Sequence, residues 1–416
     1  MTEQIVESRL PTPARIERLA LPERAADLGM SVRDAEHELE RAPSPGELLD
    51  LTYANTHRFP APAWVLPAIN EAAAGRGMTY TPYRGDATVR SAVAESLSTF
   101  LGVPVDPEGE LILTPGSQAG LFVALSSLVV PGGRVALIDP DYLSSERLLR
   151  YLGAEVTPIP LRWEDSGQPP SPDLEAMEAA FRGGVRLLLF SHPNNPTGMV
   201  YGPAVIAAIA RLAREFDVVV VADELYSRLT YEETAFSHLL AEPGMRERCV
   251  TLLGPSKTES MSGYRLGVAV GPPEVIDRME DVLGVSVLRA PAYAQHALVP
   301  WLAADHEFVR DRIVEYRTLR DTTVERLRHS PLIEVRPALG TAYMFPDVSL
   351  VGATDQEVAL ALKREAGMLI NPGYQFGRRG TGHFRLCFAQ TETAWEPALE
   401  RMVATLERLH ERGAGR

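Results

Sequence analysis

Lysine is scarce in this 416-residue chain. Its 41 basic residues include only Lys257 and Lys363, so a role that needs a deprotonatable side-chain amine has two candidates, because arginine stays protonated. Lys363 belongs to an amphipathic stretch and is expected to be a solvated surface residue, which leaves Lys257.

Cysteine is equally rare in this sequence, which has two. Cys249 and Cys387 are too few for a disulfide framework or a zinc site, and we interpret them as small buried hydrophobic residues of a protein in the reducing cytoplasm.

Basic clusters and long apolar runs are also missing. The formal net charge is −14 and no block of basic residues stands out, which argues against a nucleic-acid partner. No apolar run approaches the roughly 18 residues of a membrane span, so we expect no membrane partner either. The first residues carry charge but lack the apolar core of a secretory signal peptide. We therefore expect a cytoplasmic protein that acts on small molecules.

The pattern along the chain predicts an arm and two domains. Residues 1–47 are polar and rich in arginine and glutamate, and we interpret them as an N-terminal arm. Short apolar stretches then alternate with amphipathic ones, which is typical of an α/β domain with a mostly parallel sheet. Seven strands are predicted, at 111–114, 134–138, 155–160, 185–191, 217–222, 249–253 and 265–270. After a long helical pattern at 305–328 the elements become shorter, with strands predicted at 333–336, 342–346 and 383–388 and helices at 354–365 and 395–412. We expect a large domain at 48–300 and a smaller α+β domain at 301–416, completed by part of the N-terminal segment.

Polar residues follow these strands at the edge where ligands bind in open α/β sheets. Ser117 and Gln118 open a helix after the first strand, where backbone N–H groups and the helix dipole suit a phosphate. Tyr142 follows the second strand and can stack on a planar ligand. Asn195 presents an amide after the fourth strand, and Asp223 after the fifth presents a carboxylate that needs a cationic or hydrogen-bonding partner if buried. Alone, each of these signals is more typical of a structural turn, a half-buried loop tyrosine or a helix cap than of a ligand site.

Lys257 follows the sixth strand in a loop of small polar residues, which is unusual for a surface lysine. Its amine can form a Schiff base with an aldehyde, and Arg265, eight residues on, can pair with a phosphate. Together the strand-end residues describe one ligand, which is planar, phosphorylated and an aldehyde, with a ring nitrogen that Asp223 can keep protonated. That ligand is pyridoxal 5′-phosphate (PLP).

Several motifs resemble those of a known family. Ser256-Lys257 followed by Gly263-Tyr264-Arg265-Leu266-Gly267 matches the PLP-lysine signature of fold type I PLP-dependent enzymes, in particular the class I/II aminotransferases related to aspartate aminotransferase. Segments 195–198, 223–226, 372–377 and 383–386 match in order and spacing. The resemblance runs from about Leu49 to the C-terminus. It implies the PLP-transferase fold, with a seven-stranded, mostly parallel sheet, and an aminotransferase that passes an amino group from an L-amino acid to PLP and then to a 2-oxo acid.

The resemblance implies a role for each matching residue around the cofactor. Lys257 would form the Schiff base and act as general base and acid, and Asp223 would hold the pyridine nitrogen protonated. Tyr226 and Asn195 would hydrogen-bond the phenolic oxygen of the cofactor, and Tyr142 would stack on its ring. The phosphate would be held by Ser117, the Gln118 backbone, Ser256 and Arg265.

On the substrate side, the resemblance assigns the α-carboxylate to Arg385, because a guanidinium binds a carboxylate through two parallel hydrogen bonds. Ala54 or Asn55 occupies the position of a substrate-loop glycine, so both are candidate substrate contacts. Tyr80 resembles the tyrosine that reaches the phosphate of the neighbouring subunit, which implies an obligate homodimer with shared active sites. Arg289 stands at roughly the spacing of the arginine that binds the side-chain carboxylate in aspartate aminotransferase. It hints at an acidic substrate, with a surface arginine as the other interpretation.

Departures from the family pattern leave the reaction type open. The substrate loop lacks its glycine, Gly254 replaces a serine that would supply a phosphate hydroxyl, and Glu259 stands where the family has a small or apolar residue. The alternative on the same scaffold is a PLP-dependent lyase or carbon–carbon bond-forming enzyme, for example one acting on S-adenosylmethionine by γ-elimination or replacement. A non-catalytic regulator is a third hypothesis, but the acidic arm shows no sign of the DNA-binding domain it would need. Neither Glu259 nor the arm receives a role from the sequence.

Overall fold

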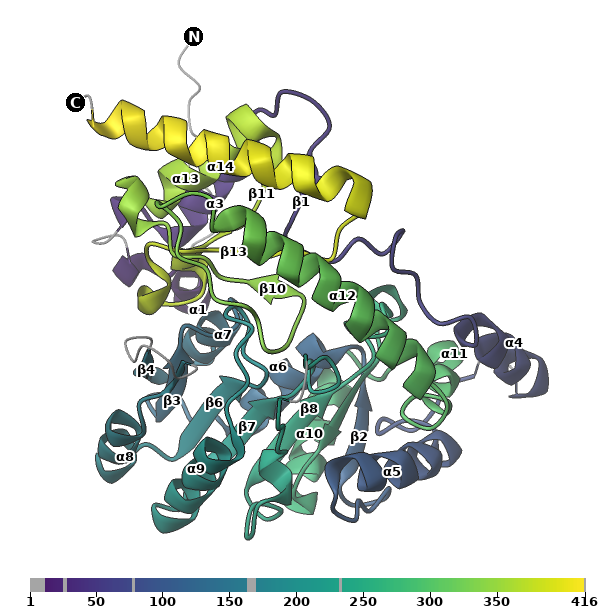
Figure 1. Ribbon diagram of the computed structural model, residues 1–416. Helices are drawn as coiled ribbons and strands as arrows, with labels where there is room; N and C mark the ends of the chain where they lie inside the picture. The colour runs from purple at the N-terminus through teal and green to yellow at the C-terminus, as the bar shows by residue number, and fades with distance from the viewer. Residues whose placement is uncertain (1–11, 25–27, 77–78, 163–169, 232–233, 415–416) are drawn as a thin grey trace.

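A computed structural model of the chain describes residues 12–24, 28–76, 79–162, 170–231 and 234–414, so residues 1–11 and 25–27 of the predicted arm lie outside the described part (Figure 1). In Figure 1 a large sheet with its helices occupies the lower half, and the C-terminal helices and small sheets lie above it. Among the described helices, none combines the length and apolar character needed to span a bilayer.

The large sheet has eight strands in the order β2-β9-β8-β7-β6-β3-β4-β5. Strands β8, β7, β6, β3 and β4 run parallel, and β2, β9 and β5 add antiparallel pairings at the two sides. The mostly parallel α/β sheet is therefore confirmed, with all seven predicted strands in place. The eighth strand, β5, has two residues and is too short to produce a periodic signal. The bounds are β2 Leu111–Thr114, β3 Arg134–Asp139, β4 Glu155–Arg162, β5 Ser171–Pro172, β6 Leu187–Ser191, β7 Val219–Asp223, β8 Cys249–Leu253 and β9 Gly267–Val270.

Helices cover both faces of this sheet. Along β3, Ala136 and Ile138 belong to one hydrophobic cluster, whereas Val135 and Leu137 belong to another, because successive side chains of a strand point to opposite faces. Burial on both faces explains why the strands are continuous apolar runs. The first face is covered by α5 (Ala87–Leu101), α8 (Leu174–Arg182) and α9 (Pro203–Glu215), and the second by α6 (Ser117–Leu128), α7 (Ser145–Tyr151) and α10 (Pro273–Val285).

The C-terminal region is built from two small sheets and three helices. Figure 1 shows α12 (His306–Leu327) running from beside the large sheet into this region, where α14 (Glu392–Ala414) packs along it. The predicted helices at 305–328 and 395–412 are present, and the one at 354–365 begins as α13 (Asp355–Ala361) and continues as a π-helix. The predicted strand at 333–336 is absent, since only one isolated bridge, at Glu334, forms there. The sheets pair β1 (Leu49–Asp50) with β11 (Met368–Leu369), and β13 (Phe384–Cys387) with β10 (Tyr343–Met344) and β12 (Asn371–Pro372).

The packing of the described residues supports two units, and the boundaries at residues 47 and 300 stay a prediction. One hydrophobic cluster gathers the C-terminal helices and sheets around Trp395 and Phe384. Leu51 and Phe59, from the N-terminal segment, pack into this same cluster. The small unit is thus completed by residues that precede the large sheet in the chain, some of which the predicted boundary assigns to the large domain.

The arm is anchored by the lysine that was expected on the surface. Helix α3 (Val32–Arg41) buries Val32 and Leu39 against the rest of the protein. Lys363 is only 6% exposed, and its Nζ donates hydrogen bonds to the carbonyl oxygens of Leu39 at 2.7 Å and Glu40 at 2.9 Å. These carbonyls lie in the last turn of α3, where helical partners are lacking and a cation is favoured. The prediction of an exposed Lys363 was therefore wrong, because the amphipathic pattern does not reveal that the arm covers this position.

Replacing Lys363 by methionine should loosen the arm. The buried carbonyls of Leu39 and Glu40 would lose their donor, so we expect the free energy of unfolding to fall by about 1–3 kcal/mol. Denaturant unfolding measures this loss, and limited proteolysis of the arm should become faster. Arg364→Met, at the adjacent exposed position, is the control and should change neither quantity. Equal effects of the two variants would contradict the anchoring role.

Candidate active site

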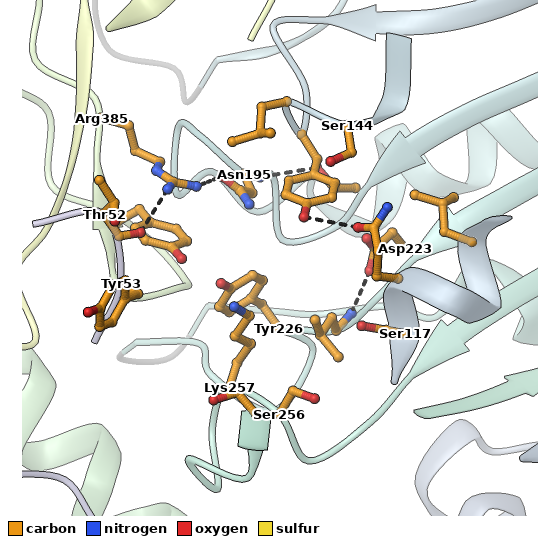
Figure 2. A pocket seen from close by; sticks show the side chains of 18 of the residues that line it. Thr52, Tyr53, Ser117, Ser144, Asn195, Asp223, Tyr226, Ser256, Lys257 and Arg385 are labelled. Atoms are coloured by element: carbon orange, nitrogen blue, oxygen red, sulfur yellow. Dashed lines mark hydrogen bonds between the residues drawn. The ribbon is translucent and has the colours of Figure 1, made fainter. Parts of the chain in front are cut away.

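The carboxyl ends of the parallel strands open into a cavity of about 620 Å³. Residues that follow β2, β3, β6, β7 and β8 meet there with residues from the N-terminal segment and the C-terminal region (Figure 2). The strand-end motifs of the sequence therefore form one site. Predicted residues on its wall are Ser117, Gln118, Tyr142, Asn195, Asp223, Tyr226, Ser256, Lys257, Arg265 and Arg385.

The centre of the cavity holds an amine, a carboxylate and a phenol. Figure 2 shows Lys257 reaching from its loop toward Tyr226, with Asp223 farther along the wall. Burial raises the pKa of Asp223 to about 6, although the Leu225 N–H and the charge of Lys257 lower it. Burial also raises the pKa of the Tyr226 phenol. A carboxylate at this depth calls for a cationic partner, which a protonated ring nitrogen would be.

One end of the cavity is suited to a phosphate. Ser117 and Gln118 begin α6, so their N–H groups and the positive end of the helix dipole face the cavity. Gly267 lets β9 approach closely, since a Cβ there would stand 2.5 Å from the Ser117 nitrogen. The Arg265 guanidinium lies over Gly116 and donates to the carbonyl oxygens of Ser262 and Pro115, with no carboxylate partner among the described residues. This end of the cavity therefore places the positive charge of Arg265 beside the N–H groups at the start of α6.

The opposite end is suited to a carboxylate. Arg385 on β13 donates from Nη1 to Asn195 Oδ1 and from Nη2 to the Thr52 carbonyl, both at 2.9 Å (Figure 2). Nη2 also donates to Asn371, and the guanidinium lies 3.9 Å from the centre of the Tyr343 ring. Nε is buried with no hydrogen-bond partner among the described residues. The guanidinium is thus fixed in orientation, and part of its donor capacity remains for a ligand.

Four predicted site residues do not line this cavity. Ala54 lines a small adjoining cavity of about 80 Å³ that also touches Lys257. Asn55 is turned into its own loop, where Oδ1 accepts the N–H groups of the residues two and three positions on. Tyr80 and Arg289 lie together on an outer surface, with the guanidinium carbon 4.6 Å from the ring centre. The roles predicted for these residues stay predictions.

Some cavity residues were not found by the sequence motifs. Thr52 and Tyr53 belong to the substrate loop. The motif comparison selected Ala54 and Asn55 in this loop, because they occupy the position of the missing glycine. Tyr343 belongs to a predicted strand, and Asn371 directly precedes the Pro372-Gly373 motif. Their proximity to Arg385 arises only from the pairing of β13 with β10 and β12. A sequence signal existed for Asn371 alone, through its neighbours.

The fold and the site together define an enzyme that uses PLP. Residues 49–402 match the family described as aminotransferase class I and II, and the chain belongs to this family. It is 34% identical over 365 residues to the aspartate/prephenate aminotransferase of Thermus thermophilus, and the aligned residues make up 87% of this chain and 92% of that protein. An aspartate aminotransferase of Musicola paradisiaca is 32% identical, over 80% of this chain and 82% of its own. The crystal structure of an aspartate aminotransferase from Rhodobacter sphaeroides superposes with a TM-score of 0.85 at 36% identity, covering 88% and 95% of the two chains.

Membership in this family makes the chain a PLP-dependent aminotransferase, and its own residues fit the cofactor. The half-buried Asp223 suits the ring nitrogen, the N-terminus of α6 with Arg265 suits the phosphate, and Lys257 is the one amine on the cavity wall. The relatives named above are all aminotransferases, so they give no support to the lyase alternative.

Glu259 lies under the lysine loop and outside the cavity. Its Oε1 accepts hydrogen bonds from Arg228 and, at 3.3 Å, from Trp301 Nε1. Arg228 also makes two hydrogen bonds to Asp305, at 2.6 and 2.7 Å, so one guanidinium is shared by two buried carboxylates. Asp305 directly precedes α12. The residue that departs from the family pattern therefore ties the Lys257 loop to the helix that spans both regions of the protein.

The Glu259 carboxyl is under electrostatic strain. Its Oε2 has no hydrogen-bond partner among the described residues, and burial raises the pKa to about 7 in spite of Arg228. Because the folded-state pKa lies above the ordinary value of 4.5, the protonated group stabilises the fold below pH 4.5, and this stabilisation is lost as the pH rises toward 7.

Glu259→Gln should remove this pH dependence. The amide retains an acceptor for Arg228 and Trp301 but does not titrate, so the variant should gain stability relative to the parent between pH 5 and 8. We expect a gain on the order of 3 kcal/mol, measured by denaturant unfolding of the PLP-free protein. Glu307→Gln, on the exposed side of α12, is the control and should leave the pH slope unchanged. A stability difference between Glu259→Gln and the parent that is constant with pH would refute the assignment.

Proposed function

We propose that this aminotransferase acts on an L-amino acid with an acidic side chain and a 2-oxo acid. The observation that carries the proposal is the meeting of Lys257, Asp223 and Arg385 on one cavity wall. The acidic side chain is supported by Arg289 and by the names of the relatives, several of which are aspartate aminotransferases.

PLP supplies an aldehyde that exchanges amines and a protonated ring that accepts electrons. The side chains of this protein supply position and proton transfer. Asp223 would keep the ring nitrogen protonated, and that positive charge would in turn favour the ionised form of its carboxyl group. Tyr226 and Asn195 would donate hydrogen bonds to the ring oxygen, and Tyr142, whose hydroxyl donates to Gln118 at 3.0 Å, would stack on the ring. The Lys257 amine would take the proton from the substrate Cα and hold it for return.

Arg385 holds the substrate so that this proton faces Lys257. Asn195, Thr52 and the Tyr343 ring fix the plane of the guanidinium before substrate arrives. A guanidinium fixed in this way binds an α-carboxylate through two parallel hydrogen bonds at little cost in side-chain entropy.

Transamination predicts a reaction that stops after one turnover when no acceptor is present. With aspartate or glutamate alone, the PLP-loaded protein should release at most one oxo acid per site, and the cofactor spectrum should change to that of the aminated form.

Borohydride treatment of the starting protein should attach a pyridoxyl group to the peptide containing Lys257, and Lys257→Ala should abolish turnover. Lys363→Met, at the other lysine, is the control and should retain activity. If the protein instead turns over many times without a 2-oxo acid acceptor, the reaction is a lyase reaction and not transamination.

A homodimer is the second part of the proposal. Large side chains are exposed together on α4 (Val65–Arg76), on the loop that follows it, at the end of α10 and on α11 (Ala292–Gln295). These elements are in contact, since α11 packs on α4 and Gln295 Nε2 donates to Thr81 Oγ1 at 3.1 Å. A contiguous apolar and aromatic surface of this kind is typical of a subunit interface. The residues that form it are Leu66, Tyr80, Val285, Val287, Leu288 and Tyr293.

Arg289 and Tyr80 stand in the middle of this surface. Tyr80 is 83% exposed, and Arg289 lies between the rings of Tyr80 and Tyr83 at 4.6 and 4.8 Å. No carboxylate pairs with Arg289 among the described residues, and its Nε is buried without a partner. A preformed cation beside an exposed tyrosine suits a role in the active site of a second copy, with Tyr80 at the phosphate and Arg289 at the side-chain carboxylate of the substrate.

Complementation in mixed dimers tests this sharing. Lys257→Ala dimers should be inactive, and Arg289→Leu dimers should be weak with aspartate. A mixed dimer has one site with both residues intact, so random mixing should restore about a quarter of the parent activity. The control mixes Lys257→Ala with Arg385→Leu, which we assign to the same site of one subunit, and it should restore nothing. If both mixtures behave alike, Arg289 does not act across an interface.

The cellular location completes the proposal. Cys249 and Cys387 are both buried free thiols, which supports the reducing cytoplasm. The proposed partners are small amino and oxo acids and a second copy of the chain.

A further inference from the structure

A second buried carboxylate, Asp141, lies next to the cofactor-binding wall and has no role in the proposed reaction. It follows β3, directly before Tyr142, and is 1% exposed. Its own N–H donates to the Phe376 carbonyl at 3.0 Å, which attaches the position to the C-terminal region. It does not line the main cavity, so any effect on the site must pass through its neighbours.

The Asp141 carboxylate accepts five hydrogen bonds, all of them from uncharged N–H and O–H groups. Oδ1 accepts the Tyr142 N–H at 2.7 Å and the Ser145 hydroxyl at 3.4 Å. Oδ2 accepts the N–H and the hydroxyl of Ser191, at 2.9 and 3.0 Å, and the Asn194 amide at 3.2 Å. No cationic side chain pairs with it among the described residues. Five donors around one carboxylate indicate a group built to hold several segments at once.

A chain of hydrogen bonds connects Asp141 to the substrate end of the site. Ser191 donates its hydroxyl proton to Asp141, and its Oγ accepts the Asn195 N–H at 3.0 Å. Asn195 in turn uses Oδ1 to accept Arg385 Nη1 at 2.9 Å. The carboxylate therefore orients Ser191, Ser191 fixes the Asn195 backbone, and the Asn195 side chain fixes Arg385.

A second branch leads to the ring end. Oδ1 accepts the N–H of Tyr142, the residue assigned to stacking on the cofactor. One carboxylate thus joins the end of β3, which carries Tyr142, to the end of β6, which leads to Asn195.

We propose that Asp141 is a positioning residue that holds the ring-stacking Tyr142 and the Asn195–Arg385 pair in one geometry, so that cofactor and substrate are aligned with each other. The inference rests on the proposed function, because it assigns the stacking and carboxylate-binding roles to Tyr142 and Arg385.

Holding a carboxylate in this place has an electrostatic cost. The pKa of Asp141 is raised to about 7, chiefly by burial and to a smaller extent by the negative charge of Asp223, while the hydrogen bonds from Ser191 and Tyr142 lower it. Burial, and after it the charge of Asp141, raises the pKa of Tyr201. The hydrogen bonds therefore favour the ionised form and offset part of the cost of burial and of the like charge, and a neutral amide in its place would not accept from all of these donors.

The experiment compares Asp141→Asn with the parent. The amide is the same size but turns an NH₂ group toward either the Tyr142 or the Ser191 donors, so at least one branch loses its acceptor. We expect KM for the amino acid, and the dissociation constant of an unreactive α-methyl amino acid, to rise about tenfold or more. The dissociation constant of PLP, titrated into the PLP-free protein, should also rise.

Two further variants separate positioning from folding. Ser191→Ala removes the hydroxyl that donates to Asp141 and accepts from Asn194 and Asn195, so it breaks the Asn195 branch and leaves the Tyr142 branch intact. It should raise KM, and it should raise the PLP dissociation constant less than Asp141→Asn does. Asp139→Asn is the matched control, since Asp139 ends β3 two residues before Asp141 and is also buried, but its carboxyl group accepts from backbone N–H groups at Arg378 and Arg379 and makes no hydrogen bond to Ser191 among the described residues. It should leave KM and both dissociation constants unchanged even if thermal unfolding shifts.

The outcomes are distinct. If Asp141→Asn matches Asp139→Asn in KM and in both dissociation constants, the positioning role is wrong. If Asp141→Asn does not fold, Ser191→Ala decides, and an unchanged KM in that variant overturns the inference. Failure of the parent protein to bind PLP, or to bind the α-methyl amino acid once loaded, would instead overturn the proposed function.

Discussion

Negative charge at the carboxyl edge of the large sheet is the interaction around which this structure is organised. Asp223 ends the parallel strand β7 near the middle of the sheet, where burial disfavours its ionised form. Lys257 offsets part of that cost, and a protonated ring nitrogen would offset more. Asp141 adds a second carboxylate close by, held by hydrogen bonds in place of a cation. An acidic chain with a net charge of −14 therefore builds a site whose walls also carry Arg265 and Arg385.

Contacts between the two regions of the protein surround this site. Arg385 comes from the C-terminal region and meets Asn195 from the end of β6. Under the lysine loop, Arg228 links Glu259 to the start of α12, the helix that continues into the C-terminal region (Figure 1). Movement of α12 relative to the sheet would therefore be transmitted to the lysine loop. Lys363 attaches the arm to the same C-terminal region.

The cofactor site could be predicted from sequence because each of its residues follows a strand whose apolar pattern is visible locally. Once the strands are parallel, their carboxyl ends share an edge, and Ser117, Tyr142, Asn195, Asp223 and Lys257 must gather there. The PLP-lysine signature then identified the ligand. Two predictions failed for the opposite reason. The strand at 333–336 has strand-like residues but a single bridge, and Lys363 has an exposed pattern but is covered by residues about 320 positions earlier in the chain.

The fold class and the cofactor follow from the sequence alone, and two lysines and one specific motif left a single candidate for the catalytic amine. The packing of the chain was needed to show that Glu259 is part of a buried ion cluster, that Asn371 and Tyr343 contact Arg385, and that Asp141 connects Tyr142 to Asn195 through Ser191. Local periodicity records which face of an element is buried. It does not record which residue of a distant element supplies the donor, because a hydrogen bond between Asn195 and Arg385 depends on the packing of two regions that fold from segments 190 residues apart.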